Sequence, residues 1–320
     1  MSTFPDRLFE SGGVPVGMAV LQPRDVRWVY SSASAQPHID LVARHTPTSK
    51  LHSTIALAEA AVTTGGNETI FLTPENHALT AVVTWDVNNT HLIGMSPIVF
   101  GYNPAYFSHT VNADVLFTVS GNNNSFTNVR WLHGYNSATN AHCIEITGNN
   151  NSFYNCHFEG PEGAAEKAIS GYDLVKVSGE YSYFKNCMFG NTWAAMTDVC
   201  ANIGFTGNKS VSSLFEDCVF QLNSGNTTNL FLHTYQSLNG GSHIHFRNCM
   251  FVNMGTSTPQ YAVDGYGLNT NNAIMSFHNC SFTGVTDIVA ATYENYVWFG
   301  PTVYHASALQ NGLAAKPDVA

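Results

Sequence analysis

The chain has 320 residues, of which 44% are apolar and only 11% are charged. The apolar share is enough for a packed core, which excludes an intrinsically disordered protein. Charged residues make up roughly a quarter of an ordinary domain, and here Asn, Thr, Ser and Gly take their place. With 22 acidic residues against 12 basic ones, a formal charge of −10 and no Lys/Arg cluster, we expect no nucleic-acid partner.

Residues 1–50 contain no repeat and mix Pro, Ser, aromatic residues and Arg. We interpret them as an N-terminal arm or attachment segment. Within them, GGVPVGMAVLQP (12–23) is too short, interrupted by proline and not flanked by basic residues, so it suits neither a secretion signal nor a membrane span. We therefore expect no membrane partner and a chain that stays in the reducing cytoplasm where it is made.

Residues 51–292 are predicted to form the body of the fold. They open with STIALAEAAVTTGGNETIFLTP (53–74), where a capping helix near 53–64 precedes a strand. Repetitive folds need such a cap because their end units would otherwise be exposed. TWDVNNTHLIGMSP (84–97) follows as the first repeat unit, and 293–320, rich in Tyr, Trp and Phe before it turns small and polar, is predicted as a C-terminal cap or tail.

A motif related to YFKNCMF (183–189) occurs six times, and its central residues are spaced by 27, 31, 31, 31 and 31 positions. These central residues are Asn128, Asn155, Asn186, Asp217, Asn248 and Asn279. Helical repeats can have a similar period. Each unit, however, alternates Phe, Val and Ile with polar residues and lacks an apolar stripe of helical spacing, which predicts strands.

The upstream half of each unit repeats as well, because LFTVSGNNNSF, CIEITGNNNSF and LVKVSGEYSYF align without gaps. The period of two predicts an inward set and an outward set of side chains. The inward set is Phe117, Val119, Ile144, Ile146, Val175 and Val177, and the outward set is Thr118, Glu145 and Lys176. One unit then consists of a strand, a Gly/Asn turn, a strand, a one-residue Asn bend, a strand and a variable loop.

Three short parallel strands per turn describe an all-β, right-handed, single-stranded parallel β-helix. On the Phe-x-Asn-Cys-x-Phe motif, the sequence resembles the pectate-lyase-like β-helix superfamily. The resemblance implies that the Asn of each unit takes the left-handed conformation at the bend between two strands, which Asn tolerates well. Stacked amides would then form a hydrogen-bonded ladder, with Asp217 as its weak step because a carboxylate cannot donate onward.

The seven cysteines are predicted to be free thiols that fill space. Five belong to the motif, and two, Cys143 and Cys200, lie outside it. One cysteine at the same position in five of the six units, beside inward Phe residues, indicates a small member of a packed stripe, whereas a nucleophile would need a His partner. In YFKNCMF this places Phe184, Cys187 and Phe189 inside, with Lys185 and Met188 outside.

The sequence contains no recognisable glycosidase or lyase motif. The superfamily includes lyases, glycoside hydrolases, esterases and non-catalytic spikes, so the fold does not choose among them. The Asn-Thr-Asp, Asp-Asp, Gly-His-Gly and Arg-Ile-Lys strings of polygalacturonase-like enzymes are absent. So are the Asp runs that would bind calcium in a lyase, and the two arginines within the units, Arg130 and Arg247, lie four units apart. We assign no catalytic, cofactor-binding or metal-binding residue and expect no cofactor.

The remaining acidic candidates lie in FEGPEGAAEKAISGYD (158–173) and in the next loop. They are Glu159, Glu162, Glu166 and Asp198, which would form a diverged hydrolase site or, more simply, a solvated loop tip. Asp264 suits a turn, and Glu145 with Lys176 suits an outer-face ion pair that contributes little. Of the 14 His residues, His243 and His245 form a His-x-His pair without a third ligand, and His157 faces away from Cys156, so no metal is expected.

The low charge, the cysteines and the missing catalytic motifs favour a structural protein. Over about residues 50–290 the layout is similar to β-helix proteins of tailed-phage virions, which implies a capsid decoration, head spike or tail-associated protein, trimeric, located in the virion after assembly in the host cytoplasm. The implied partners are the major capsid protein or other virion proteins, with a host-surface glycan as a further one. The alternatives are a polysaccharide-degrading tailspike, with Trp193 and Tyr235 lining its groove, and a glycan-binding module without catalysis.

Overall fold

The computed structural model describes the greater part of the chain. It covers residues 26–31, 43, 47–95, 105–109, 115–133, 142–160, 168, 170–190, 195–207, 211–235, 241–271, 273–300, 303–306 and 314–315. Glu162, Glu166 and Trp193 lie outside the described residues. No helix in the described part is long and apolar enough to cross a membrane.

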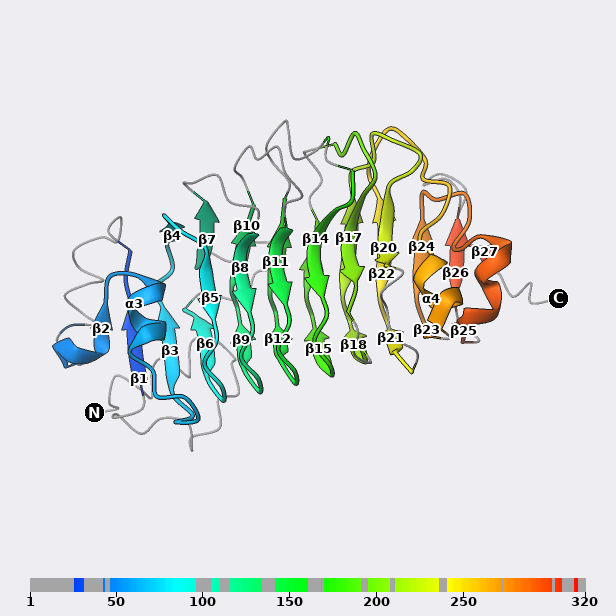
Figure 1. Cartoon of the computed structure of the whole chain (residues 1–320). Coiled ribbons are helices and arrows are strands. Elements are labelled where there is room, and N and C mark those ends of the chain that lie inside the picture. The colour runs from blue at the N-terminus through cyan, green and yellow to red at the C-terminus, as the bar shows by residue number, and fades with distance from the viewer. Residues whose placement is uncertain are drawn as a thin grey trace, which may run out of the picture.

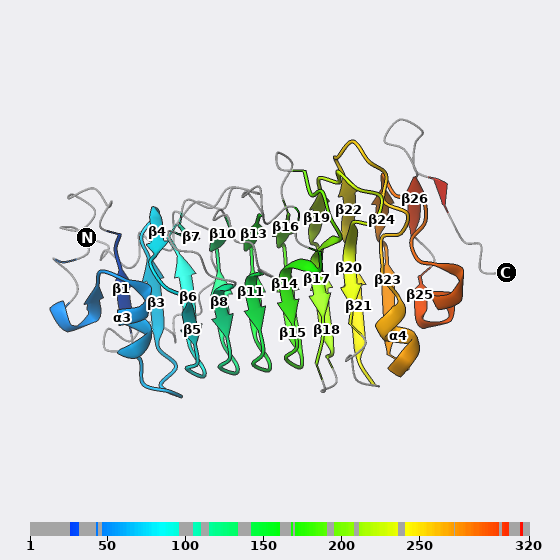
Figure 2. The ribbon, with the colours of Figure 1, turned by 45° about the horizontal axis from the view of Figure 1, so that its top comes forward.

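The chain coils into a rod whose walls are three β-sheets of 11, 10 and 6 strands, which we name sheets A, B and C. Figure 1 shows the turns of the coil side by side between the two termini, and Figure 2 shows the sheets as rows along the rod. Neighbouring strands pair in parallel throughout, except for the last pair of sheet B. We call one turn of the coil a rung.

Within each sheet, hydrogen-bonded neighbours lie in the following order. Sheet A contains β2 (Leu51–His52), β1 (Val26–Val29), β3 (Thr69–Leu72), β6 (His91–Gly94), β9 (Ser125–Thr127), β12 (Ser152–Tyr154), β15 (Ser182–Lys185), β18 (Ser213–Glu216), β21 (His243–Arg247), β23 (Ile274–His278) and β25 (Val297–Phe299). Sheet B contains β27 (Ala314–Ala315), β26 (Tyr304–Ala306), β24 (Ser281–Thr283), β22 (Met250–Asn253), β19 (Val219–Leu222), β16 (Met188–Phe189), β13 (His157–Glu159), β10 (Arg130–Leu132), β7 (Tyr106–His109) and β4 (Asn76–Leu79). Sheet C contains β20 (Leu230–Thr234), β17 (Cys200–Phe205), β14 (Tyr172–Val177), β11 (His142–Ile146), β8 (Val115–Val119) and β5 (Val83–Trp85).

The predicted alternation of inward and outward residues is confirmed in sheet C. Phe117, Ile144 and Val175 are register partners on three adjacent strands, and all are fully buried. Glu145 and Lys176, which lie one position further along, are partly exposed and form an ion pair of 3.6 Å on the outer face. Exposed pairs of this kind contribute little to stability, as expected.

The one-residue bends between sheets A and B have the predicted left-handed backbone. All six central residues of the motif have φ between 52° and 58°. Asn279 Nδ2 donates to Asn248 Oδ1 over 2.9 Å, and Asn248 Nδ2 donates to Asp217 Oδ1 over 3.0 Å. An ionised carboxylate cannot donate to the next amide, Asn186, so the ladder is interrupted at the predicted position.

A second column of Asn side chains occupies the turns between sheets C and A, where the sequence predicted only a turn. Asn151 Oδ1 accepts from the backbone N–H of Asn124, whose own Oδ1 accepts from the N–H of Thr90. The amide of Asn151 donates to the carbonyl of Gly121 over 2.9 Å. Both Asn side chains are buried, and these bonds satisfy backbone groups that the tight turn leaves unpaired.

Two columns of aromatic rings fill the core. Along sheet A, rings one rung apart are 4.6 to 5.9 Å apart in the order Phe126, Phe153, Phe184, Phe215, Phe246, Phe277 and Phe299. Along sheet B the separations are 4.4 to 5.1 Å in the order Trp131, Phe158, Phe189, Phe220, Phe251 and Phe282. Rings of one column meet the other edge to face, a favourable arrangement of aromatic pairs.

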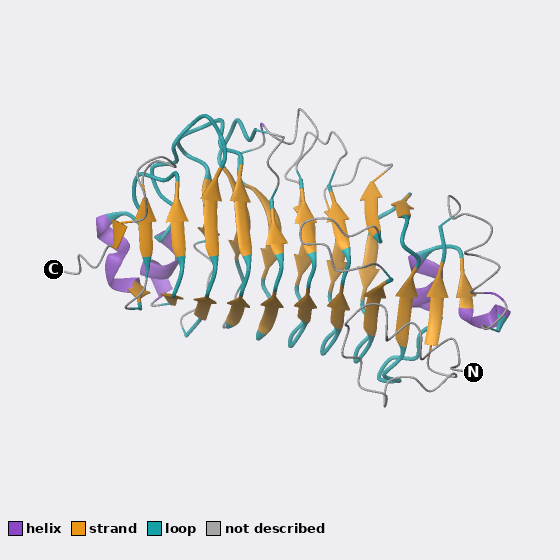
Figure 3. Cartoon of the chain, turned by 180° about the vertical axis from the view of Figure 1, so that it is seen from behind, coloured by secondary structure: helices purple, strands orange, loops and turns teal. Residues whose placement is uncertain are grey.

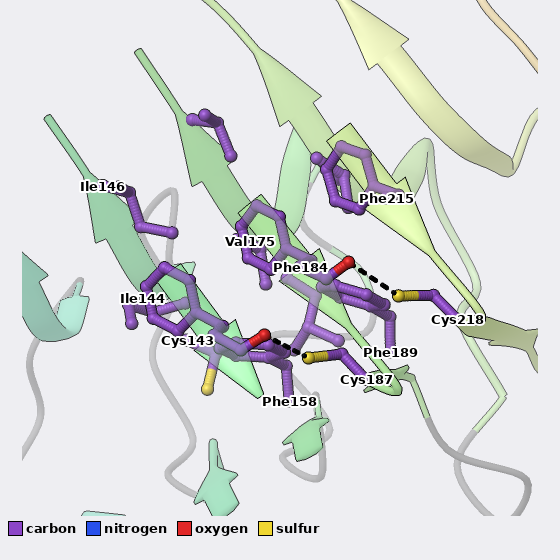
Figure 4. Packing of buried hydrophobic residues seen from close by; sticks show 14 of the residues in the cluster. Cys143, Ile144, Ile146, Phe158, Val175, Phe184, Cys187, Phe189, Phe215 and Cys218 are labelled. Carbon is purple, nitrogen blue, oxygen red and sulfur yellow. Dashed lines mark hydrogen bonds between the residues drawn. The ribbon is translucent and has the colours of Figure 1, made fainter. Parts of the chain in front are cut away.

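The motif cysteines lie between the two columns as free, buried thiols, as predicted. Each thiol donates to the backbone carbonyl of the sheet A Phe one rung earlier, for example Cys218 to Phe184 over 3.6 Å. Figure 4 shows this contact and the neighbouring rings. Burial holds the pKa of Cys187 well above that of an ordinary thiol, so it stays protonated and unreactive.

The ends of the rod differ from the predictions in detail. The expected helix is α3 (Ile55–Ala60), and Thr54 caps it by accepting from the N–H of Leu57. However, β1 lies inside the predicted arm 1–50 and pairs with β3, so residues 26–29 belong to the sheet. Strands β1 and β3 therefore precede residues 84–97, which do not form the first rung of the rod.

Short helices also lie near both ends (Figure 3): η3 (Thr48–Lys50) precedes β2, while α4 (Tyr266–Asn271) and η5 (Ala291–Tyr296) lie near the C-terminal end.

Candidate functional site

A cluster of titratable side chains lies across adjacent strands of sheet C. Asp173 belongs to β14, His233 belongs to β20, and the strand between them, β17, presents Gly204. A Cβ atom at Gly204 would come within 2.0 Å of Asp173 Oδ2. A glycine inside a strand often marks a close approach, and here it makes room for the carboxylate to reach across the strand.

The imidazole of His233 lies between two carboxylates. Its Nδ1 is 3.3 Å from Asp173 Oδ1, and its Nε2 is 3.6 Å from Asp264 Oδ2. Tyr235 donates its hydroxyl to Asp173 Oδ2 over 2.6 Å and packs its ring 4.1 Å from that of His233. We name Asp173, Gly204, His233, Tyr235 and Asp264 the sheet C cluster.

The cluster favours the protonated form of His233. Burial alone lowers the pKa of His233, but the hydrogen bond and charge of Asp173 and the charge of Asp264 outweigh burial and raise the pKa above its usual value. Burial, then the charge of Asp173 and the hydrogen bond to it, raises the pKa of Tyr235, so its hydroxyl remains a donor. The raised pKa therefore favours the imidazolium form of His233 between the side chains of Asp173 and Asp264.

Such an arrangement could transfer a proton, but its access is limited. The Asp173 side chain is fully buried, whereas 19% of the His233 side chain and 30% of the Asp264 side chain are exposed. A substrate on the outer face would therefore meet His233 and Asp264, and Asp173 would act only by orienting the imidazole.

The acidic residues singled out from the sequence do not form a common site in the described part. Glu159 is the last residue of β13, not a loop tip, and it is buried in an ion pair with Arg130. Asp198 Oδ1 accepts from the N–H of Val199, as in a local turn. Arg130 belongs to sheet B and Arg247 to sheet A, where Arg247 pairs with Glu216 at 3.5 Å.

The other polar candidates have structural contacts. Asp264 Oδ1 accepts from the N–H of Tyr266, as expected of a turn, but its second oxygen faces His233. His157 is buried, with Nε2 3.2 Å from the carbonyl of Gly190. His243 and His245 are exposed on β21. In the described part, no three His, Cys, Asp or Glu side chains are grouped so that they could hold a metal ion.

Sequence reasoning missed Asp173 and His233, which are 60 positions apart. The signal that could have revealed them is Gly204 in the otherwise apolar stretch CANIGF (200–205).

Three solved structures are similar to the chain over most of its length. A pectin methylesterase mutant in complex with a hexasaccharide matches with a TM-score of 0.60 and 16% identity, covering 91% of both chains. The pectin methylesterase of Aspergillus niger matches with a TM-score of 0.59 and 15% identity, covering 93% of both chains. Pectate lyase Pel9A matches with a TM-score of 0.55 and 13% identity, covering 91% of this chain and 78% of that one.

The chain is a right-handed parallel β-helix, the fold that it shares with these structures. This confirms the predicted fold class. Identities this low show the fold alone. Neither a protein-family profile nor a curated protein sequence matches the chain.

Proposed function

We propose that the chain is a non-catalytic structural protein of a bacteriophage virion, a rigid rod that serves as a capsid decoration, a head spike or a tail-associated part. It assembles as a homotrimer, and its partners are the major capsid protein or other virion proteins. The proposal combines the resemblance of residues 50–290 to such proteins with one structural observation, the two unbroken ring columns of the core.

The ring columns support a mechanical role. Each inner ring of the sheet A column packs between two neighbours, which for Phe215 lie 4.6 and 4.7 Å away. Bending the rod would separate rings on one side and press them together on the other, and close-packed interiors resist both. A rod of this kind keeps its two ends at a fixed distance, which suits a spike or spacer.

The sheet C cluster supports the hypothesis of a non-catalytic protein. Asp173, the carboxylate nearest to His233, is fully buried and already accepts hydrogen bonds from Tyr235 and His233. A catalytic carboxylate must reach the substrate, and a glycosidase needs two that do so.

The test is co-purification with the particle. Virions of the phage that encodes the chain are banded in a density gradient and probed with an antibody against the chain, and immunogold labelling then locates it on head or tail. We expect the chain to band with the particle. Its absence from purified particles would overturn the proposal.

A matched truncation tests the arm. Because β1 begins at Val26 and pairs with β3, the variant should lack residues 1–25 and not 1–50. We expect the shortened chain to keep the β-sheet circular dichroism of the full chain and to stay unbound in a reconstitution with particles. A shortened chain that still binds would refute the attachment role of this segment.

A second candidate is a polysaccharide-acting enzyme, favoured by the imidazole between Asp173 and Asp264 and by the likeness to pectin methylesterases and a pectate lyase. Here His233 would act as the proton donor or acceptor on the outer face. Incubation with pectin, capsule and lipopolysaccharide would then release methanol, reducing ends or unsaturated product. His233→Asn should abolish the release, whereas Glu145→Gln, on the same face, should not.

A further inference from the structure

Six outer-face side chains of sheet A form a regular lattice near its C-terminal end. They come from β21, β23 and β25 and are His243, His245, Arg247, Ile274, His278 and Trp298. The register aligns His243 with Ile274, His245 with Ser276 and Trp298, and Arg247 with His278. We name these six residues the sheet A patch. Partner strands are about 4.8 Å apart, so the patch extends along the rod axis.

The patch contains an exposed aromatic platform. The Trp298 side chain belongs to a residue that is 56% exposed, and the His278 ring meets it edge to face with ring centroids 4.7 Å apart. Ile274, 43% exposed, adds a second apolar surface on the neighbouring strand. A flat sheet that presents a large exposed indole beside hydrogen-bonding rings has the mixed apolar and polar character of a sugar-binding surface.

The patch also contains an available cation. Arg247 is the most exposed of the described Lys and Arg side chains that form ion pairs, at 58%. Its single described partner is Glu216, whose Oε1 lies 3.5 Å away, while Oε2 already accepts from Tyr183 and Lys185. A guanidinium with most of its five donors free can bind a carboxylate in a bidentate manner.

Three imidazoles lie on the same face as this cation, two on its own strand and His278 as its register partner. His243 and His245 are exposed on the same strand, with ring centroids 6.2 Å apart. His245 Nδ1 is 2.6 Å from Ser276 Oγ, which fixes the orientation of its ring. Burial, followed by charge interactions with His243, His278 and Arg247, lowers the pKa of His245 below its usual value and so favours its neutral ring.

We propose that the sheet A patch binds an acidic polysaccharide. A sugar ring packs on Trp298, its carboxylate pairs with Arg247, and His243 and His245 donate to ring hydroxyls or to a neighbouring acidic group. The regular spacing of the strands suits a repeating polymer. This site is separate from the sheet C cluster, and it holds whether or not the rod belongs to a virion.

Charge decides between the possible occupants. A second copy of the chain carries the same net charge of −10, which opposes the association of two copies. A neutral glycan offers no carboxylate to the donors of Arg247 that its ion pair with Glu216 leaves free. A polymer with one negative charge per sugar matches both the cation and the platform.

The experiment measures binding of the full chain to immobilised polygalacturonate, with dextran as the neutral polymer and oligo-dT as the non-sugar polyanion. We expect binding to polygalacturonate that weakens as salt rises, because exposed charges are screened. Trp298→Ala and Arg247→Ala should each weaken it by at least about tenfold, as for central contacts of an interface. Dextran and oligo-dT should not compete.

Two residues outside the patch, one exposed and one partly exposed, supply matched controls. Tyr181→Ala removes an aromatic ring that is 62% exposed, and Lys176→Ala removes a cation from sheet C. Both should bind as the unaltered chain does. The proposal is overturned if polygalacturonate does not bind, if all four variants bind alike, or if oligo-dT binds with the same dependence on Trp298, which would make the patch a nucleic-acid site. All variants replace side chains that are exposed or partly exposed on the outer face, so circular dichroism should be unchanged.

Discussion

Asn248 donates its side-chain amide to Asp217 Oδ1 over 3.0 Å, one rung away along the column of bends. The same donor direction cannot continue from Asp217 to Asn186, because an ionised carboxylate accepts hydrogen bonds and does not donate them. Asp217→Asn should complete the ladder. We expect the free energy of unfolding to rise by about 0.5–1.5 kcal/mol, the usual range for one net hydrogen bond, in urea denaturation followed by circular dichroism.

The reciprocal variant is the control. Asn248→Asp places a carboxylate directly beside Asp217 and should lower the free energy of unfolding through charge repulsion. If Asp217→Asn leaves the urea midpoint unchanged or lowers it, the amide ladder does not stabilise the fold.

The ring columns predict a strong dependence on position. Phe215→Ala removes a ring that is stacked on both sides and should destabilise the fold by about 3–5 kcal/mol. Phe299 belongs to β25, the last strand of sheet A, and has one stacked neighbour in the column at 5.9 Å. Phe299→Ala should therefore cost much less. Equal losses in thermal unfolding would contradict a continuous column.

The cysteines predict a simple titration. Because all seven are buried thiols, a thiol reagent at pH 8 should react slowly with the folded chain. In denaturant without a reductant, the same reagent should count seven thiols. Fewer than seven before reduction would reveal a disulfide, and rapid reaction of the folded chain would show that a thiol faces solvent.

The raised pKa of His233 predicts a pH-dependent stability difference. Its folded-state pKa exceeds the unfolded value near 6.5, so the contribution of the protonated ring is fully present below that pH and is lost as the pH rises through the folded pKa. The difference in unfolding free energy between the unaltered chain and His233→Gln should therefore be largest near pH 6 and smaller above.

His77 provides a control of opposite sign. Burial lowers its pKa, so the contribution of the neutral ring is present above pH 6.5 and is lost as the pH falls. The stability difference between the unaltered chain and His77→Gln should shrink toward acid pH. If the stability differences for His233→Gln and His77→Gln change in the same direction with pH, the pKa of the two imidazoles is not shifted in opposite directions.

Much of the fold follows from local chemistry that repeats. Asn186 and its equivalents mark the bends because Asn tolerates left-handed backbone, and Phe184 and Phe189 mark the core because they alternate with polar residues. One repeated unit therefore predicts strands, bends and interior together. The first strand, β1, was missed because VRWV (26–29) has no repeat partner and joins the sheet only through β2 and β3.

The sheet C cluster could not be predicted in the same way. Asp173 and His233 occupy different positions in strands that are two rungs apart, and they meet only because Gly204 lacks a side chain. Glu159 illustrates the converse error. It looked like a loop residue, but strand β13 extends far enough to place it beside Arg130. A contact between two single residues that are far apart in the sequence produces no repeating sequence pattern from which it could be predicted.

The constant spacing of the units has a consequence for the gene. Because Phe184, Phe215 and Phe246 occupy equivalent positions 31 residues apart, loss or duplication of one whole unit joins surfaces that already match. The rod would become shorter or longer by about 4.8 Å while every bend and ring kept an equivalent neighbour. Insertion of a single residue within a strand would instead turn that strand inside out. Recombination between units could therefore change the length of this protein in discrete steps without redesigning its interior.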